Sequence, residues 1–259
     1  MLIPFVIWSL LYSGVNVLQN IHKGKAVNWL GVIYRFIVGK SATPFYYIVV
    51  LFQLTLLTPF LVKMVKEKGI ISKLLWLVTP IYLVYVYAWN FMTGSSPRLY
   101  ETLFPAWFGF YYLGIQVKCG LKMNGRKWIL AIMFLLSCFE ALFLRHYSMS
   151  QGFYTSQITA GSFLYTGAFI GVLLQEESRG DRKESILSRI GDCSYGIFYI
   201  HMIILLLVGK FVGRVSWMDS NWILYWGMRF ILTSVISFVV IEIGQKCMGK
   251  KMLRWIGFV

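Results

Sequence analysis

The chain has 259 residues, of which 58% are hydrophobic and only 14% are charged. This hydrophobic share is roughly what eight bilayer-crossing helices of ~20 residues would need, and it excludes a disordered, collagen-like or coiled-coil chain. The net charge of +15 would point to nucleic acid in a soluble protein, but here the basic residues lie in short loops between apolar runs. The composition therefore predicts an all-α, polytopic helical membrane protein with no nucleic-acid partner.

Eight apolar stretches predict about eight transmembrane helices in a single domain over residues 1–259. They cover residues 1–19, 43–65, 73–92, 104–118, 128–147, 158–175, 193–213 and 222–244. The segment from Trp29 to Gly39 differs from them, because its apolar residues recur at helical spacing while Arg35 and Lys40 flank them. This pattern indicates an additional interfacial helix that lies on the membrane.

The distribution of lysine and arginine predicts the orientation. Sixteen of these 25 residues lie in alternate loops and the C-terminal tail, and nine lie on the opposite side. Because basic residues concentrate in cytoplasmic loops, both termini are predicted to face the cytoplasm in a multi-pass protein of the cell membrane. Lys23, Lys25, Arg35 and Lys40 are exceptions, since this arrangement puts their loop on the outer side.

Three stretches resemble the integral-membrane acyltransferases of acyltransferase family 3. Ile3–Tyr12 is similar to the family's third helix through its Ile-Pro-Phe and Trp-Ser-Leu-Leu-Tyr strings, and Pro44–Pro59 is similar to the family's helix with Phe-Tyr, Gln, Leu-Leu and Pro. The most specific stretch is Ile190–His201, in which a Gly-x-x-Ser-Tyr-Gly string precedes His201 on one membrane helix. Leu113–Ile115 is a weaker match, and the resemblance covers essentially the whole chain.

The resemblance also shows where this chain departs from the family pattern. Members typically have ten membrane helices, with an important histidine in the first and an arginine-containing motif after the second. The similarity begins at the third helix, so we expect a truncated form that corresponds to the C-terminal eight helices and lacks both elements. At the other end, Ile241–Gly244 resembles the closing Glu-x-Pro element, with Gly244 in place of the proline.

His201 is the first candidate for chemistry. Acyl transfer from a thioester to a hydroxyl needs a base for the hydroxyl proton and a group that stabilises the oxyanion. His201 lies near mid-membrane on the same helix face as Ser194, and an ionisable group at that depth indicates a functional site. The alternative is a neutral imidazole that joins two helices by hydrogen bonds. Ser194 and Tyr195, from the same string, are substrate-binding candidates.

Two carboxylates and an arginine are further candidates. Glu140 is the most deeply placed carboxylate, and its insertion would cost ~2.5–3.5 kcal/mol unless it is paired or protonated. Arg229 and Asn90 are its possible partners, and a purely structural polar contact is the alternative to a catalytic role. Glu242, in the closing element, is the third catalytic candidate. Arg229 is a substrate-binding candidate, and its alternative role is that of an interfacial anchor.

A basic cluster is the candidate donor site, because its charges would suit the phosphates of coenzyme A arriving from the cytoplasm. Topology alone also demands positive charge in a cytoplasmic loop. The cluster contains Lys118, Lys122, Arg126 and Lys127. The sequence contains no metal-ligand spacing, phosphate loop or nucleophile elbow, and its four cysteines form no Cys-x-x-Cys pair. We therefore expect no bound metal and no resident cofactor, with acyl-coenzyme A as a co-substrate.

The resemblance implies a membrane-bound acyltransferase, or a fragment of one. Such an enzyme would move an acetyl or similar group from acyl-coenzyme A to a hydroxyl or amine of a cell-surface glycan precursor or amino acid, as in O-acetylation of a cell-envelope polysaccharide. Its expected partners are membrane lipid, acyl-coenzyme A and that acceptor. The alternatives are a non-catalytic polytopic protein, such as a transporter or exporter subunit, and an inactive truncated remnant.

Overall fold

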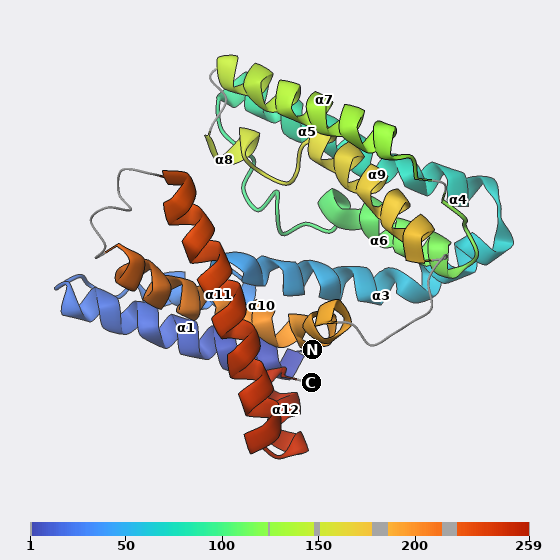
Figure 1. The fold of residues 1–259 in the computed structure, drawn as a ribbon. Coiled ribbons are helices and arrows are strands. Elements are labelled where there is room, and N and C mark those ends of the chain that lie inside the picture. The colour runs from blue at the N-terminus through green and yellow to red at the C-terminus, as the bar shows by residue number, and fades with distance from the viewer. Residues whose placement is uncertain (1, 124, 148–150, 178–185, 214–221, 259) are drawn as a thin grey trace. The chain divides into compact units, whose positions relative to one another are not determined.

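The computed structural model describes residues 2–123, 125–147, 151–177, 186–213 and 222–258. Every regular element in these ranges is a helix (Figure 1). The chain divides into two compact units. The terminal unit contains Met1–Ile48 and Arg182–Val259, and the central unit contains Val49–Asp181. That the whole chain acts as one domain stays a prediction.

Both units consist of packed helices. The terminal unit holds α1 (Leu2–His22), α2 (Trp29–Ile37), η1 (Thr43–Phe45), the start of α3 (Tyr46–Glu67), α10 (Ile186–Val212), α11 (Trp222–Cys247) and α12 (Lys250–Ile256). The central unit holds the rest of α3, α4 (Ile70–Leu74), η2 (Leu75–Leu77), α5 (Val78–Thr93), α6 (Pro105–Lys118), α7 (Lys127–His146), α8 (Gln151–Tyr154) and α9 (Ala160–Glu177).

Each of the eight apolar stretches is helical, with ends mostly within a turn of the predicted ones. In the described part of the chain, six helical segments are long and apolar enough to cross a membrane. The remaining two stretches form shorter helices: α6 has 14 residues, and the apolar part of α9 covers Ala160–Gln175. The fold class of a polytopic helical membrane protein is therefore confirmed. The additional helix α2 is also present, and none of its residues is buried.

In the central unit, one hydroxyl joins α5 to α6. The predicted stretch over residues 73–92 is divided into α4, the tight turn η2 and α5, with the irregular turn just before Pro80, where the proline ring would clash with the preceding turn. Thr79 donates to the carbonyl oxygen of Pro105 (2.8 Å) and accepts from the backbone N–H of Gly109 (2.8 Å). A membrane offers no water to satisfy such groups, so this bridge fixes the start of both helices.

In the terminal unit, α10 and α11 run antiparallel, and glycines set their register. A Cβ on Gly196 would lie 2.9 Å from the side chain of Ile241, and one on Gly209 would lie 2.9 Å from that of Arg229. At these two positions, side chains of α11 therefore fill space that a side chain on α10 would otherwise occupy. The short helix α12 packs against α1, where the Trp8 indole donates to the carbonyl oxygen of Ile256 (2.9 Å).

Candidate active site

Aromatic residues from the three resembling stretches meet in the terminal unit. Tyr199 of α10 is fully buried; its ring stacks on Trp8 (centroids 6.2 Å apart) and meets Phe45 edge-on (5.6 Å). Tyr12 donates from its hydroxyl to the backbone oxygen of Tyr199 (2.9 Å). Phe198 also stacks on Phe45, with the ring centroids 6.0 Å apart. These five residues form the aromatic cluster, which ties α10 to α1 and to η1, the turn just before α3.

His201 lies beside the aromatic cluster, with its ring centroid 6.3 Å from that of Phe198. Its Nδ1 is 3.0 Å from the backbone oxygen of Ile197. A carbonyl oxygen can only accept, so Nδ1 carries the proton and the neutral ring keeps its lone pair on Nε2. Within the described residues no hydrogen bond reaches Nε2. This geometry leaves Nε2 free to take a proton from a substrate.

Ser194 and Tyr195, from the Ser-Tyr-Gly string, take different positions on α10. Ser194 is exposed and lies two turns before His201 on α10. Tyr195 has its hydroxyl 2.9 Å from that of Tyr199. Tyr195 is therefore attached to the aromatic cluster, whereas Ser194 shares only a helix face with His201.

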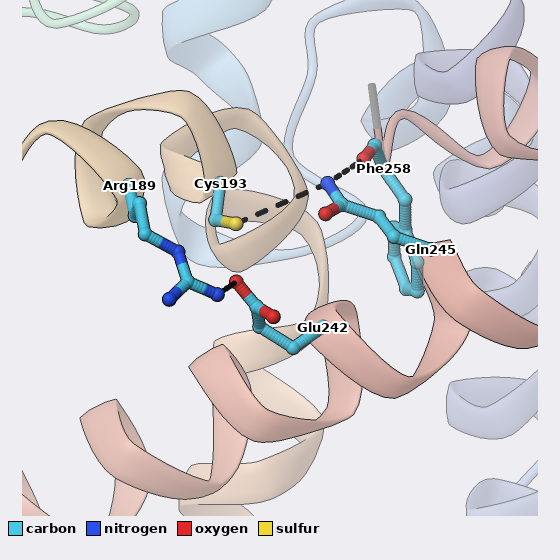
Figure 2. Close-up of polar contacts among 5 residues, drawn as sticks. All are labelled: Arg189, Cys193, Glu242, Gln245 and Phe258. Atoms are coloured by element: carbon cyan, nitrogen blue, oxygen red, sulfur yellow. Dashed lines mark hydrogen bonds and ion pairs between the residues drawn. The ribbon is translucent and has the colours of Figure 1, made fainter. Parts of the chain in front are cut away.

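Glu242 pairs with Arg189 at the start of α10, with 2.6 Å between the oxygen and the guanidinium nitrogen. Figure 2 shows these two side chains pointing toward each other across α10 and α11. Arg189 precedes His201 by twelve residues, which is ~18 Å along a helix. The carboxylate is thus held beside the start of α10 and away from the imidazole.

Beside this pair, the C-terminal segment enters the space between α10 and α11. The Gln245 amide donates to the carbonyl oxygen of Phe258 (2.6 Å) and lies 3.9 Å from the sulfur of Cys193 (Figure 2). A Cβ on Gly244 would lie 2.9 Å from the Phe258 ring, and one on Gly196 would lie 3.2 Å from it. This contact gives a physical reason for glycine at position 244, where the resemblance led us to expect proline.

Arg229 projects from α11 onto Gly209 of α10. Its Nη1 donates to the Tyr225 hydroxyl at 3.3 Å, and its guanidinium carbon lies 4.8 Å from the ring centroid of Trp226. The guanidinium is therefore packed against aromatic rings and against α10. A side chain that acted only as an interfacial anchor would extend toward the membrane surface instead.

Glu140 lies in the central unit and binds the beginning of α9. It accepts from the Tyr87 hydroxyl at one oxygen and from the backbone N–H of Gly161 (2.6 Å) at the other. The Tyr87 hydroxyl in turn accepts from the backbone N–H of Ala160 (3.0 Å). Free N–H groups and the helix dipole favour negative charge at such a terminus. Of the two possible partners named for Glu140, Asn90 instead donates to the carbonyl oxygen of Val86 (2.9 Å). Arg229 belongs to the other unit, so its pairing with Glu140 stays a prediction.

The basic cluster also belongs to the central unit. Its four side chains are exposed in the connection between α6 and α7 and at its edges: Lys118, Lys122, Arg126 and Lys127. Exposed positive charge can attract phosphate groups from water. It is equally expected of a loop whose basic residues only fix the orientation of the chain in the membrane.

The family model for the acyltransferase domain of acyltransferase family 3 matches residues 1–242. The chain belongs to acyltransferase family 3. No curated protein and no solved structure matches it. The match covers most of α11 together with every helix before it, so it includes both the aromatic cluster and the basic cluster.

Within this family 3 protein, the structure divides the predicted site residues between two units. Residues of α10 and α11 lie in the terminal unit: Ser194, Tyr195, His201, Arg229 and Glu242. Glu140 and the basic cluster lie in the central unit. The candidate active site of the terminal unit consists of His201 and the aromatic cluster beside it.

Sequence analysis missed three polar residues beside the predicted ones: Tyr87, which bonds to Glu140, and Thr233 and Ser237, which lie on the same helix as Arg229. Tyr87 gave no signal, because one tyrosine among 16 carries no distinguishing spacing. Thr233 and Ser237 did give a signal, since they follow Arg229 at intervals of four and so share its helix face. A search for polar residues at helical spacing inside apolar spans would have found this row.

Proposed function

We propose that this family 3 protein transfers an acetyl or similar acyl group from acyl-coenzyme A to a hydroxyl or amine of a cell-surface glycan precursor or amino acid. The observation that carries the proposal is the family match over residues 1–242. The geometry of His201 supports it, because an imidazole with a free Nε2 is the group that acyl transfer to a hydroxyl needs.

His201 has a defined role in the proposed reaction. Nε2 takes the proton of the acceptor hydroxyl while the oxygen attacks the thioester carbonyl carbon. The carbon–sulfur bond then breaks, and the imidazolium returns the proton to the coenzyme A sulfur. The bond from Nδ1 to the Ile197 oxygen keeps the ring in the tautomer that the first step requires. The products are the acyl ester and free coenzyme A.

We place the donor on the cytoplasmic side, beside the basic cluster. In the central unit, hydrogen bonds join α4 to the last turns of α6. The Ser72 hydroxyl of α4 lies 2.7 Å from the Tyr112 hydroxyl of α6 and also accepts from the Gln116 amide of α6 (3.4 Å). The basic residues around α4 and those at the end of α6 therefore lie at one end of this unit. Such a concentration of positive charge supports a cytoplasmic side and would suit the phosphates of coenzyme A.

The test uses membranes from cells that produce the protein in its natural form and from cells that lack it. Both are incubated with acetyl-coenzyme A labelled in the acetyl group, and label is measured in isolated envelope glycan and in added amino acids. We expect label in one acceptor fraction only when the protein is present. Equal label in both membranes, with active protein from a known acetyltransferase as the positive control, would overturn the proposal.

A further inference from the structure

Arg229 occupies a site that the packing of α10 and α11 leaves open for it. The guanidinium lies where a side chain at position 209 would otherwise be, because a Cβ there would come within 2.9 Å of Nη2. Tyr225 and Trp226 cover it from their own helix, with ring centroids 5.2 and 4.8 Å from the guanidinium carbon. Aromatic faces favour a cation at this distance, so the charge is held in a fixed place.

Among the described residues of the terminal unit, no carboxylate lies within 4.0 Å of the Arg229 guanidinium. Its Nε is shielded from solvent and has no hydrogen-bond partner. Within the described ranges of the terminal unit, the Tyr225 hydroxyl is the one acceptor for the guanidinium, through Nη1. An arginine inside a membrane is costly unless an anion or a polar cavity compensates it, so an anion that reached this site from outside the unit would stabilise the charge.

Two further polar groups extend the site along α11. Thr233 and Ser237 lie one and two turns beyond Arg229 and are 7% and 0% exposed. Neither hydroxyl has a hydrogen-bond partner. Several other helical hydroxyls bond to the carbonyl four residues earlier, as Ser234 of the same helix does to Phe230 (2.8 Å). Among the described residues, Ser9 of α1 is another buried hydroxyl without a partner, so the missing bonds distinguish the row formed by Arg229, Thr233 and Ser237 within α11.

We propose that this row is a binding site for a phosphate group carried by a membrane amphiphile. The planar guanidinium presents paired N–H donors that match phosphate oxygens, and the Thr233 hydroxyl, one turn along the helix, can donate to a further oxygen of the same headgroup. Arg229 follows the first residue of α11 by seven positions, which is ~10 Å along the helix. Phosphate is the anion that lipids supply near that depth, so it fits the site better than a free carboxylate.

The experiment measures lipid binding rather than acyl transfer, so it stands apart from the proposed enzyme activity. The whole protein is purified in an alkyl maltoside, which has no phosphate, and phosphatidylglycerol or diacylglycerol is added at increasing concentration. Native mass spectrometry reports the fraction of protein with bound lipid. The variants are Arg229→Gln, which removes the charge, and Gly209→Ala, which fills the space under the guanidinium. The matched controls are Lys210→Gln, a neighbouring exposed cation, and Gly227→Ala, whose Cβ would meet nothing within 4 Å.

The proposal predicts that phosphatidylglycerol binds and that diacylglycerol does not. Arg229→Gln and Gly209→Ala should each weaken phosphatidylglycerol binding by tenfold or more, while both controls bind as the parent does. Equal binding by Arg229→Gln and parent would overturn the proposal. So would an equal loss in Lys210→Gln, since the lipid would then be responding to interfacial charge in general. Should Gly209→Ala fail to fold, Arg229→Lys, which keeps the charge without the paired donors, provides the second test and should bind several-fold more weakly.

A further arm distinguishes a lipid headgroup from phosphate dissolved in water. Inorganic phosphate at millimolar concentration is added to the parent and to Arg229→Gln, and displacement of phosphatidylglycerol is followed. We expect little displacement, because Thr233 and Ser237 are buried beyond the guanidinium. Displacement by inorganic phosphate in the parent would reject the amphiphile as the natural source.

Discussion

At the scale of single residues, Glu140 shows how a carboxylate can be accommodated in a membrane helix without an ion pair. Its two oxygens accept from the Tyr87 hydroxyl and from the backbone N–H of Gly161. A backbone N–H at the start of α9 therefore finds its acceptor in a side chain of α7, 21 residues earlier in the chain. The sequence predicted that Glu140 needs a partner, but it could not identify a hydroxyl and a backbone group, because neither carries a charge signal.

Substitution of Glu140 should affect stability more than chemistry. In Glu140→Ala, the Gly161 N–H and the Tyr87 hydroxyl lose their acceptor, and an unsatisfied buried group costs ~1–3 kcal/mol. We expect a lower thermal midpoint and lower folded yield, measured by fluorescence-detected size-exclusion chromatography after heating. The control is Glu67→Ala, whose ion pair with Lys63 is largely exposed and should matter little. Normal stability with abolished acyl transfer would instead make Glu140 catalytic.

At the scale of elements, glycines determine how α10, α11 and the C-terminal segment pack. Gly257 ends α12 with φ +78°, a conformation that residues with a side chain rarely adopt. The chain then turns so that Phe258 lies against Gly196 and Gly244. The apolar runs predicted the long helices well, because hydrophobic length is what a bilayer selects. The short helix α12 was missed, since a seven-residue segment with four apolar and three basic residues has neither that length nor a clear period.

The glycine contacts lead to a test of the C-terminal segment. Gly244→Ala places a methyl group 2.9 Å from the Phe258 ring, and overpacking of this kind typically costs ~1–3 kcal/mol. We therefore expect a lower thermal midpoint for this variant.

Two further variants make that test specific. In a Phe258→Ala background, the same Gly244→Ala change should cost much less, because the ring that it meets is gone. Gly191→Ala, at a position on α10 where a Cβ meets nothing within 4 Å, should be neutral or slightly stabilising. Equal losses from Gly244→Ala with and without Phe258 would show that the ring is not the reason for glycine at position 244.

At the scale of the whole molecule, the candidate residues lie in two units. His201 and Glu242 come from the terminal unit, and Glu140 comes from the central unit. Helical periodicity predicted which residues share a face of one helix, such as Ser194 and His201. It could not predict the pairing of Glu242 with Arg189 or of Glu140 with Tyr87, because those contacts depend on which helices are neighbours. The candidate site was therefore less predictable than the helices that carry it.

The orientation of the protein is a testable property at this scale. We predict that the connection with Lys122 and the C-terminus both face the cytoplasm, because sixteen of the 25 basic residues lie on that side. In a chain whose four cysteines are replaced by serine, Lys122→Cys should react with an impermeant maleimide only after the cells are opened. Arg98→Cys, on the opposite side, should react in intact cells. Labelling of Lys122→Cys in intact cells would reverse the orientation.

His201 provides the most direct test of the central claim that this protein is an acyltransferase with an imidazole base. The informative variant is His201→Asn, because Asn90 in this same chain donates its side-chain N–H to the carbonyl four residues earlier (2.9 Å). Asparagine can therefore keep the bond that Nδ1 makes to Ile197 while it removes the base. His146→Asn, at the exposed end of α7, is the matched control.

The measurement is the rate of acetyl transfer from labelled acetyl-coenzyme A in membranes that contain equal amounts of each folded protein. The predicted result is a loss of roughly 10²-fold or more for His201→Asn, the usual scale for a positioned proton-transfer group, with His146→Asn close to the parent. A rate for His201→Asn within a few-fold of the parent would contradict the account and leave His201 as a residue that only packs beside the aromatic cluster.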